Sequence, residues 1–256
     1  MAATVTTRFV QDNSSTLWKG PRLISVRPVE YASSSPYRTH NAYRGRRPAH
    51  VAGNEPASAL SKRIFDATAA SLALLFFAPL LIAIAIAIKT TSRGPVFFQQ
   101  YRYGYRNRLF RIYKFRSMHV DLGDVAGVRQ TVQGDSRVTR VGKILRSTSL
   151  DEIPQLINVV KGEMSLVGPR PHVPGMLAAH MPYEDLVPYY FQRHTARPGI
   201  TGLAQVSGCR GSTVEPGLAI ARIDHDLEYI AKWSLRMDMM IIAQTVRREF
   251  LSGNGF

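Results

Sequence analysis

The stretch Leu145–Pro171, LRSTSLDEIPQLINVVKGEMSLVGPRP, combines a short helical pattern with two adjacent carboxylates and flanking arginines. Ser149 with Glu152 is one possible N-terminal cap of the helix, and Asp151 with Pro154 in the first turn is the other. Either cap places both carboxylates in the first turn, where free backbone N–H groups favour ionised carboxylates and attract phosphate. The glycine after the apolar run is the predicted end of the helix.

The basic residues around this pair decide between two interpretations. An Asp-Glu pair at a helix start is usually only a solvated cap. Here the turn Gly168–Pro171 follows within one loop, and a proline on each side of Arg170 fixes the backbone of a residue suited to bidentate phosphate recognition. Arg146 precedes the pair, so cations lie on both sides of it. We therefore interpret the stretch as the catalytic centre of a phosphoryl-transfer enzyme.

Spaced motifs between Lys62 and Thr245 resemble the bacterial sugar transferase family, the monotopic polyprenyl-phosphate phosphoglycosyl transferases that begin exopolysaccharide and other glycan assembly. The motifs are, in chain order, KRIFD at 62–66, GPVFFQQ at 94–100, KFRSM at 114–118, DSRVT at 135–139, the block at 149–162, GPRP at 168–171, RPGITGL at 197–203 and DLEY at 226–229. The number and order of these motifs carry the resemblance.

The resemblance implies a two-step transfer of a sugar phosphate. Asp151 would attack the β-phosphate of a UDP-sugar, release UMP and hold the sugar phosphate as an acyl phosphate until undecaprenyl phosphate attacks it. Glu152 would hold Mg²⁺, which offsets the charge of the phosphates. The expected sugar is a hexose, galactose or glucose, by likeness to enzymes that prime exopolysaccharide synthesis.

Further residues of the motifs are expected to bind substrate. Four cations would stabilise the transferring group: Lys114, Arg116, Arg146 and Arg170. Alternation along a strand would place the first two of these on one side, facing the same diphosphate. Arg137 and Gln155 match family positions without an assigned role, and the turn at Thr201 offers free N–H groups that could hold a nucleotide.

Composition indicates an anionic partner. The 256 residues carry 33 Lys and Arg against 18 Asp and Glu, a formal net charge of +15. The candidates are nucleic acid, an acidic membrane surface and a phosphorylated substrate. The single Cys209 excludes an intramolecular disulfide and is interpreted as a small buried apolar residue.

The segment Ile64–Ile88 is the most hydrophobic part of the chain, with Asp66 as its one charge and Pro79 near its middle. As a helix it would extend about 37 Å, enough to span a hydrocarbon core of about 30 Å. Cations precede it, and residues 89–116 carry eight Lys and Arg with no acid, so both flanks favour the cytoplasm. A re-entrant helix that bends at Pro79 is therefore the expected geometry, with a single span and a buried soluble helix as alternatives.

Two aromatic and β-branched runs, at 96–101 and 109–115, predict a β-hairpin. Arginines alternate with aromatic residues along it, which is also typical of single-stranded nucleic-acid binding. Beside a membrane segment we favour contact with inner-membrane lipid headgroups, and we expect no nucleic-acid partner.

The expected fold is a helix-dominated α+β domain on a re-entrant membrane helix. Residues 1–60 would form a disordered basic tail, 61–90 the membrane helix and 91–256 a cytosolic catalytic part at the bacterial inner membrane. Residues 121–134 are expected to form a polar loop. Further helices are predicted at 138–145, at 182–191 near the lipid interface because of clustered tyrosines, and as one or two amphipathic helices in 222–250.

Overall fold

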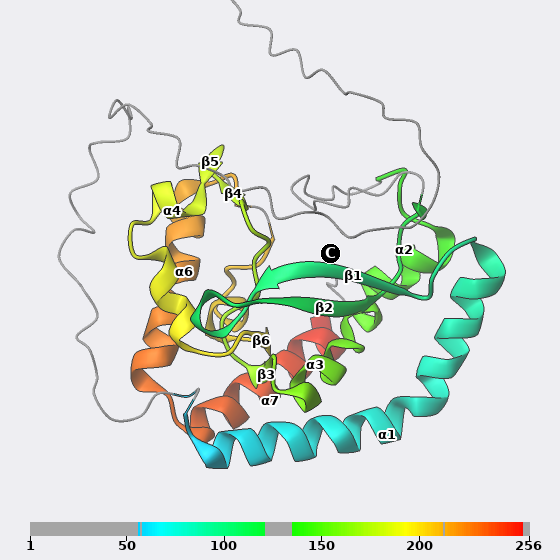
Figure 1. The fold of residues 1–256 in the computed structure, drawn as a ribbon, viewed down its shortest axis with the longest axis horizontal. Helices are drawn as coiled ribbons and strands as arrows, with labels where there is room; N and C mark the ends of the chain where they lie inside the picture. Colours follow the sequence, from blue (N-terminus) through cyan, green and yellow to red (C-terminus); the bar gives the residue numbers. More distant parts are fainter. Residues whose placement is uncertain (1–55, 57, 121–134, 212, 253–256) are drawn as a thin grey trace, which may run out of the picture. The chain divides into compact units, whose positions relative to one another are not determined.

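The computed structural model describes residues 56, 58–120, 135–211 and 213–252 and shows a helix-dominated α+β fold (Figure 1). The helices are α1 (Leu60–Thr91), α2 (Arg140–Ser147), α3 (Gln155–Lys161), α4 (Tyr183–Leu186), α5 (Leu203–Val206), α6 (Pro216–Lys232) and α7 (Leu235–Ser252). The strands are β1 (Phe97–Tyr103), β2 (Leu109–Phe115), β3 (Ser165–Val167), β4 (Leu177–Ala178), β5 (Met181–Pro182) and β6 (Gly199–Thr201). The predicted tail, as far as Glu55, and the predicted loop at 121–134 lie outside the described residues.

The long helix α1 confirms the predicted apolar helix and extends it at both ends. Its 32 residues correspond to about 48 Å, and by length and composition it could cross a membrane. Pro79 lies inside the helix, and Figure 1 shows α1 bending part-way along its length. A proline removes one helical hydrogen bond and clashes with the preceding turn, which explains the bend.

The side of α1 that does not pack on the protein is apolar. Large hydrophobic residues along the whole helix are exposed, including Leu72, Leu75, Phe76, Ile82 and Ile86. A continuous apolar surface of this kind indicates contact with lipid or with a protein partner.

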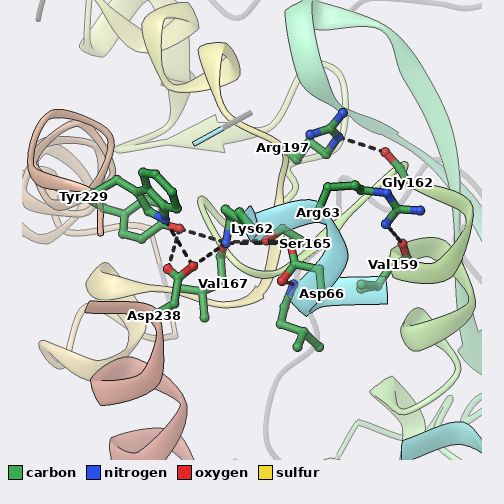
Figure 2. A network of polar contacts seen from close by, with 12 residues as sticks. Lys62, Arg63, Asp66, Val159, Gly162, Ser165, Val167, Arg197, Tyr229 and Asp238 are labelled. Atoms are coloured by element: carbon green, nitrogen blue, oxygen red, sulfur yellow. Dashed lines mark hydrogen bonds and ion pairs between the residues drawn. The ribbon is translucent and has the colours of Figure 1, made fainter. Parts of the chain in front are cut away.

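The start of α1 is joined to the rest of the fold by buried charges, which Figure 2 shows. Lys62 Nζ lies 2.6 Å from Asp238 Oδ2 of α7, and both residues are buried. Asp66 accepts hydrogen bonds from the Ser165 hydroxyl at 2.7 Å and from the Leu166 backbone N–H at 3.2 Å, both on β3. Lys62, interpreted from the sequence as a membrane-flanking cation, is therefore part of the protein interior.

The neighbouring cation Arg63 is also bonded within the fold. Its guanidinium donates to the carbonyl oxygens of Val159 and Val160 at 2.6 and 2.7 Å, which completes the last turn of α3. Gly162 follows with a positive φ of 82°, so the predicted end of this helix is confirmed.

The hairpin β1–β2 is confirmed and packs against α3. Asn158 on α3 is fully buried; its side chain accepts from the Tyr113 backbone N–H at 3.0 Å and donates to the Arg111 carbonyl at 2.7 Å. Phe110 and Ile112 of β2 share a core with Val159. The amide and the apolar contacts together fix β2 beside the segment that carries the two carboxylates.

The end of α1 packs on the other end of the hairpin. Ile84 and Ile88 form a buried cluster with Phe115 of β2 and Leu145 of α2. Both ends of α1 therefore contact the same folded unit.

The C-terminal part confirms two helices, α6 and α7, but corrects the prediction for residues 182–191. This segment forms the short α4 and the start of a 3₁₀ helix, Tyr190–Thr195. Tyr183 and Tyr190 are 0% and 1% exposed and pack on Ile223 of α6. The prediction that the clustered tyrosines lie at a lipid interface is wrong for these two, because α6 provides an apolar face that buries them.

Candidate active site

The carboxylate pair lies on a 3₁₀ turn, Leu150–Glu152, directly before α3. The expectation that both carboxylates sit in the first turn of the α-helix is therefore wrong, because α3 begins only at Gln155. Ser149 has a left-handed backbone with φ 54° and makes no capping hydrogen bond, whereas an N-cap residue adopts an extended backbone.

Glu152 is bound by two cations, one that precedes it in the sequence and one that follows it. Lys114 Nζ and Arg170 Nη2 each lie 2.7 Å from Glu152 Oε1. Arg170 Nη1 makes a longer contact of 3.4 Å to Oε2. Burial alone would raise the pKa of Glu152, but the charges and hydrogen bonds of Arg170 and Lys114 hold that pKa well below its usual range. Glu152 is therefore ionised at neutral pH.

Asp151 is buried beside this ion pair, with 9% of its surface exposed. Burial raises the pKa of its carboxyl and the charge of Glu152 adds to the rise, while Lys114, Arg146 and Arg170 act in the opposite direction. The arrangement places a partly desolvated carboxylate among cations. These cations can offset the negative charge of a phosphate that approaches the carboxylate.

The loop that carries Arg170 is fixed by close backbone packing. Strand β3 pairs in parallel with β6, with Ser165 opposite Gly199. A Cβ atom on Gly168 would lie 2.4 Å from the Arg197 carbonyl oxygen, and one on Gly199 would lie 2.1 Å from the Gly168 nitrogen. Only glycine allows this approach, so the motifs at 168–171 and 197–203 form one packed unit.

A buried ion pair holds the same loop from the other side. Arg193 is 1% exposed, and its Nη2 donates to the Arg170 carbonyl oxygen at 2.6 Å. Asp226 of α6 accepts from Arg193 Nε at 2.8 Å. The loop also lies beside Tyr103 and His194, which line the same shallow surface depression. The backbone of Arg170 is thus held by a buried guanidinium that is paired with Asp226.

Arg116 was expected to face the same diphosphate as Lys114, but the structure separates the two side chains. Arg116 is 5% exposed and donates to the carbonyl oxygens of Ser92 and Arg93 at 2.8 and 2.6 Å. Strand β2 ends at Phe115, so strand alternation no longer applies at the next residue. Arg116 therefore ties the end of α1 to the hairpin, and its contacts do not include Glu152.

The other predicted substrate-binding residues lie on neighbouring elements. Arg137 forms a bidentate pair with Asp135, at 2.6 Å for Nη2 to Oδ2. The Thr201 hydroxyl lies 2.6 Å from that of Thr245 on α7, and Gln155 is buried on α3. Their substrate-binding roles stay predictions.

Comparison with known proteins assigns the chain to a family. Residues 57–252 match the family described as bacterial sugar transferase. The chain belongs to the bacterial sugar transferase family. The resemblance seen in the sequence motifs is thereby confirmed.

Relatives of this sugar transferase share about half of their aligned residues with it. It is 54% identical over 195 residues to the exopolysaccharide production protein PSS of Rhizobium leguminosarum bv. phaseoli, covering 76% of this chain and 98% of that protein. It is 50% identical over 197 residues to the undecaprenyl-phosphate glucose phosphotransferase of Komagataeibacter xylinus, covering 77% of this chain and 37% of that protein. It is 44% identical over 200 residues to the UDP-N-acetylgalactosamine-undecaprenyl-phosphate N-acetylgalactosaminephosphotransferase of Aeromonas hydrophila, covering 78% of this chain and 46% of that protein. The chain thus spans less than half of the two named phosphotransferases.

The carboxylate pair of this sugar transferase offers a limited set of metal ligands. Among the described residues, no group of three or more His, Cys, Asp and Glu is placed to hold a metal ion. Mg²⁺ usually takes one or two carboxylates and completes its shell with water and substrate phosphates. Glu152 Oε2 has only the long 3.4 Å contact to Arg170, so this oxygen keeps capacity for a metal brought together with a phosphorylated substrate.

Two residues that support the site escaped the sequence analysis. Asp226 stood in a family motif without a role, and Arg193 stood in none of the motifs. No local sequence pattern marks these two residues as part of the site. Their role follows from a tertiary contact, in which Arg193 donates to the carbonyl oxygen of Arg170, 23 residues earlier.

Proposed function

We propose that this protein transfers a sugar 1-phosphate, of which glucose 1-phosphate is the best supported, from a UDP-sugar to undecaprenyl phosphate in exopolysaccharide synthesis. The observation that carries the proposal is the burial of Asp151 beside an ion-paired Glu152, in the field of Lys114, Arg146 and Arg170. The name of the K. xylinus relative supports the acceptor and the transferred glucose phosphate, that of the A. hydrophila relative supports a UDP-sugar donor, and that of the R. leguminosarum relative supports the process.

In the first step a carboxylate oxygen of Asp151 attacks the β-phosphorus of the UDP-sugar. The bond from this phosphorus to the oxygen that bridges the two phosphates breaks, and UMP leaves with the electron pair. The product is an acyl phosphate that links Asp151 to the sugar phosphate. Lys114 and Arg170 stabilise the negative charge that develops on the transferring group.

In the second step a phosphate oxygen of undecaprenyl phosphate attacks the same phosphorus. The bond to Asp151 breaks, the carboxylate is regenerated, and undecaprenyl diphosphate sugar is the product. A carboxylate is a suitable leaving group here because Lys114, Arg146 and Arg170 offset part of the cost of forming the buried anion.

Glu152 would hold Mg²⁺ together with phosphate oxygens of the substrate, and the metal would supply additional positive charge to the phosphates. Removal of divalent cations with EDTA is expected to abolish UMP release, and added Mg²⁺ is expected to restore it. Undiminished activity in EDTA would contradict the metal role.

We also propose that α1 is re-entrant and that the catalytic part lies on the cytoplasmic face of the inner membrane. The support is that Lys62 at its start and Ile88 near its end both contact the same folded unit, while the intervening apolar side is exposed. This placement brings a membrane-bound acceptor and a soluble donor to one site.

The deciding experiment uses the donor alone. Incubation of the full chain with UDP-glucose is expected to release UMP and to add the mass of one hexose phosphate to the protein, as a ping-pong mechanism requires. Asp151→Asn should show neither product. Turnover without any adduct would indicate direct transfer, and near-normal turnover by Asp151→Asn would remove Asp151 as the nucleophile. A panel of UDP-sugars in the same assay identifies the donor.

A further inference from the structure

We infer that Arg102, together with Gln100, binds a phosphate group of a substrate beside Arg170. This inference rests on the proposed function and adds a binding element on β1 to it. The chemistry recognised is that of phosphate oxygens, which the donor diphosphate and the polyprenyl phosphate both carry.

The position of Arg102 directs its side chain to the loop after β3. Its Nη1 donates to the carbonyl oxygen of Pro171 at 3.2 Å. Its Nη2 donates to Gln100 Oε1 at 2.6 Å, so two alternate residues of β1 act as a pair. Pro171 follows Arg170 directly, so Arg102 contacts the residue next to the one that binds Glu152.

The two atoms of this pair that are buried without a partner are both hydrogen-bond donors. A guanidinium has five N–H donors, of which these bonds use two. Arg102 Nε is buried without a partner, and so is Nε2 of Gln100, whose residue is only 7% exposed. Buried donors without partners are costly, and a ligand that completes them must supply acceptor oxygens.

The charge balance indicates that this acceptor is an anion. The hydrogen-bond partners of Arg102 named above are neutral oxygens. Burial lowers its pKa to about 10 and the charge of Arg170 adds to the fall, while Glu152 opposes it. A desolvated cation beside a like charge is stabilised by an anionic partner, and a guanidinium matches phosphate in a bidentate manner.

The experiment compares Arg102→Gln and Arg102→Lys with Arg140→Gln, which removes an exposed arginine from α2. The full chain is assayed in two arms. One arm measures UMP release from UDP-glucose without acceptor, and the other measures loss of the preformed adduct after undecaprenyl phosphate is added. The thermal unfolding midpoint of each variant is recorded alongside.

Arg102→Gln is expected to slow one arm by about 10²-fold, the usual effect of removing one donor to a charged transition state. Arg102→Lys should recover part of the loss, and Arg140→Gln should match the wild type. The midpoint of Arg102→Gln should equal or exceed that of the wild type, because an uncompensated buried charge is removed. If UMP release is slowed, Arg102 binds the diphosphate of the donor. If only the loss of the adduct is slowed, Arg102 binds the phosphate of the lipid acceptor.

Equal rates for Arg102→Gln and wild type in both arms would overturn the inference and leave the proposed function intact. So would a loss of activity that only follows a loss of stability, since that result indicates a structural role in holding the loop. A wild type that releases no UMP from any UDP-sugar would instead overturn the proposed function, and the inference with it.

Discussion

At the scale of single residues, the site separates two neighbouring carboxylates by their surroundings. Glu152 shares its Oε1 with Lys114 and Arg170 and stays ionised, whereas burial raises the pKa of Asp151. In the proposed mechanism these adjacent groups have different roles: Asp151 is the nucleophile, and Glu152 is the anion that binds the two cations.

The raised pKa of Asp151 predicts a pH dependence. An ordinary aspartate has a pKa near 3.8, and the pKa of Asp151 lies above that value. The nucleophile must be deprotonated, so kcat/KM for UMP release should fall as the pH drops through the raised pKa. Arg146→Gln removes a cation that lowers this pKa, and the acidic limb of its profile should therefore lie at higher pH. Lys143→Gln, an exposed neighbour on α2, serves as the control. An unshifted limb in Arg146→Gln would contradict the electrostatic coupling.

At the scale of elements, Arg193 and Asp226 position the loop after β3 without contact to the reacting atoms. Arg193→Lys keeps the positive charge, but a lysine lacks the planar guanidinium that donates to the Arg170 carbonyl and to Asp226 at the same time. We expect kcat/KM to fall by about 10-fold or more, the scale that loss of a supporting hydrogen bond produces at an organised site.

The control for this prediction is Arg222→Lys. Arg222 is also buried and bonds carbonyl oxygens, at Cys209 and Gly211, away from the carboxylate pair. It should lose a similar amount of stability while its activity per folded molecule is retained. Equal losses of activity in both variants would mean that Arg193 acts only through general stability.

The helix α1 predicts a topology that chemical labelling can test. In a Cys209→Ser background, single cysteines at the exposed Leu60 and Thr91 should both react with an impermeant maleimide from the cytoplasmic side only. A cysteine at Phe76, which is 78% exposed, should be shielded by lipid. Labelling of Leu60→Cys and Thr91→Cys from opposite sides would instead mean that α1 crosses the membrane.

At the scale of the whole molecule, buried charges join the membrane helix to the catalytic part. Lys62 pairs with Asp238, which also accepts from Trp233 Nε1 at 3.1 Å. The Tyr229 hydroxyl lies 2.8 Å from the same carboxylate (Figure 2). One carboxylate thereby links α1, α6 and α7, so in the proposed topology the position of α1 in the bilayer would set the orientation of the site.

Lys62→Met should destabilise the fold by about 3–5 kcal/mol, because it leaves Asp238 charged and without its buried cation. Lys232→Met, which breaks an exposed pair with Glu228, should cost about 1 kcal/mol or less. The free energies of unfolding in denaturant measure both changes. Similar small values for the two variants would contradict the structural role of the Lys62–Asp238 pair.

The sequence by itself predicted the apolar helix with its proline, the β-hairpin, the end of α3 at Gly162 and the carboxylate pair with its family. These features depend on local spacing and on residue types with strong backbone preferences, such as proline and glycine. Local reasoning failed at Ser149, one of the two predicted caps, which has a left-handed backbone and no capping hydrogen bond to its side chain.

Only the tertiary structure decided which cations meet the carboxylates. Lys114 and Arg170 reach Glu152 from 38 and 18 residues away, while Arg116 turns to the end of α1. The tertiary structure also places Lys62 in the interior, and it brings Arg193 into hydrogen-bond contact with the Arg170 carbonyl. The physical reason is that the direction of a long charged side chain follows from which partners the packed elements bring within hydrogen-bond distance, and a linear pattern does not contain those distances.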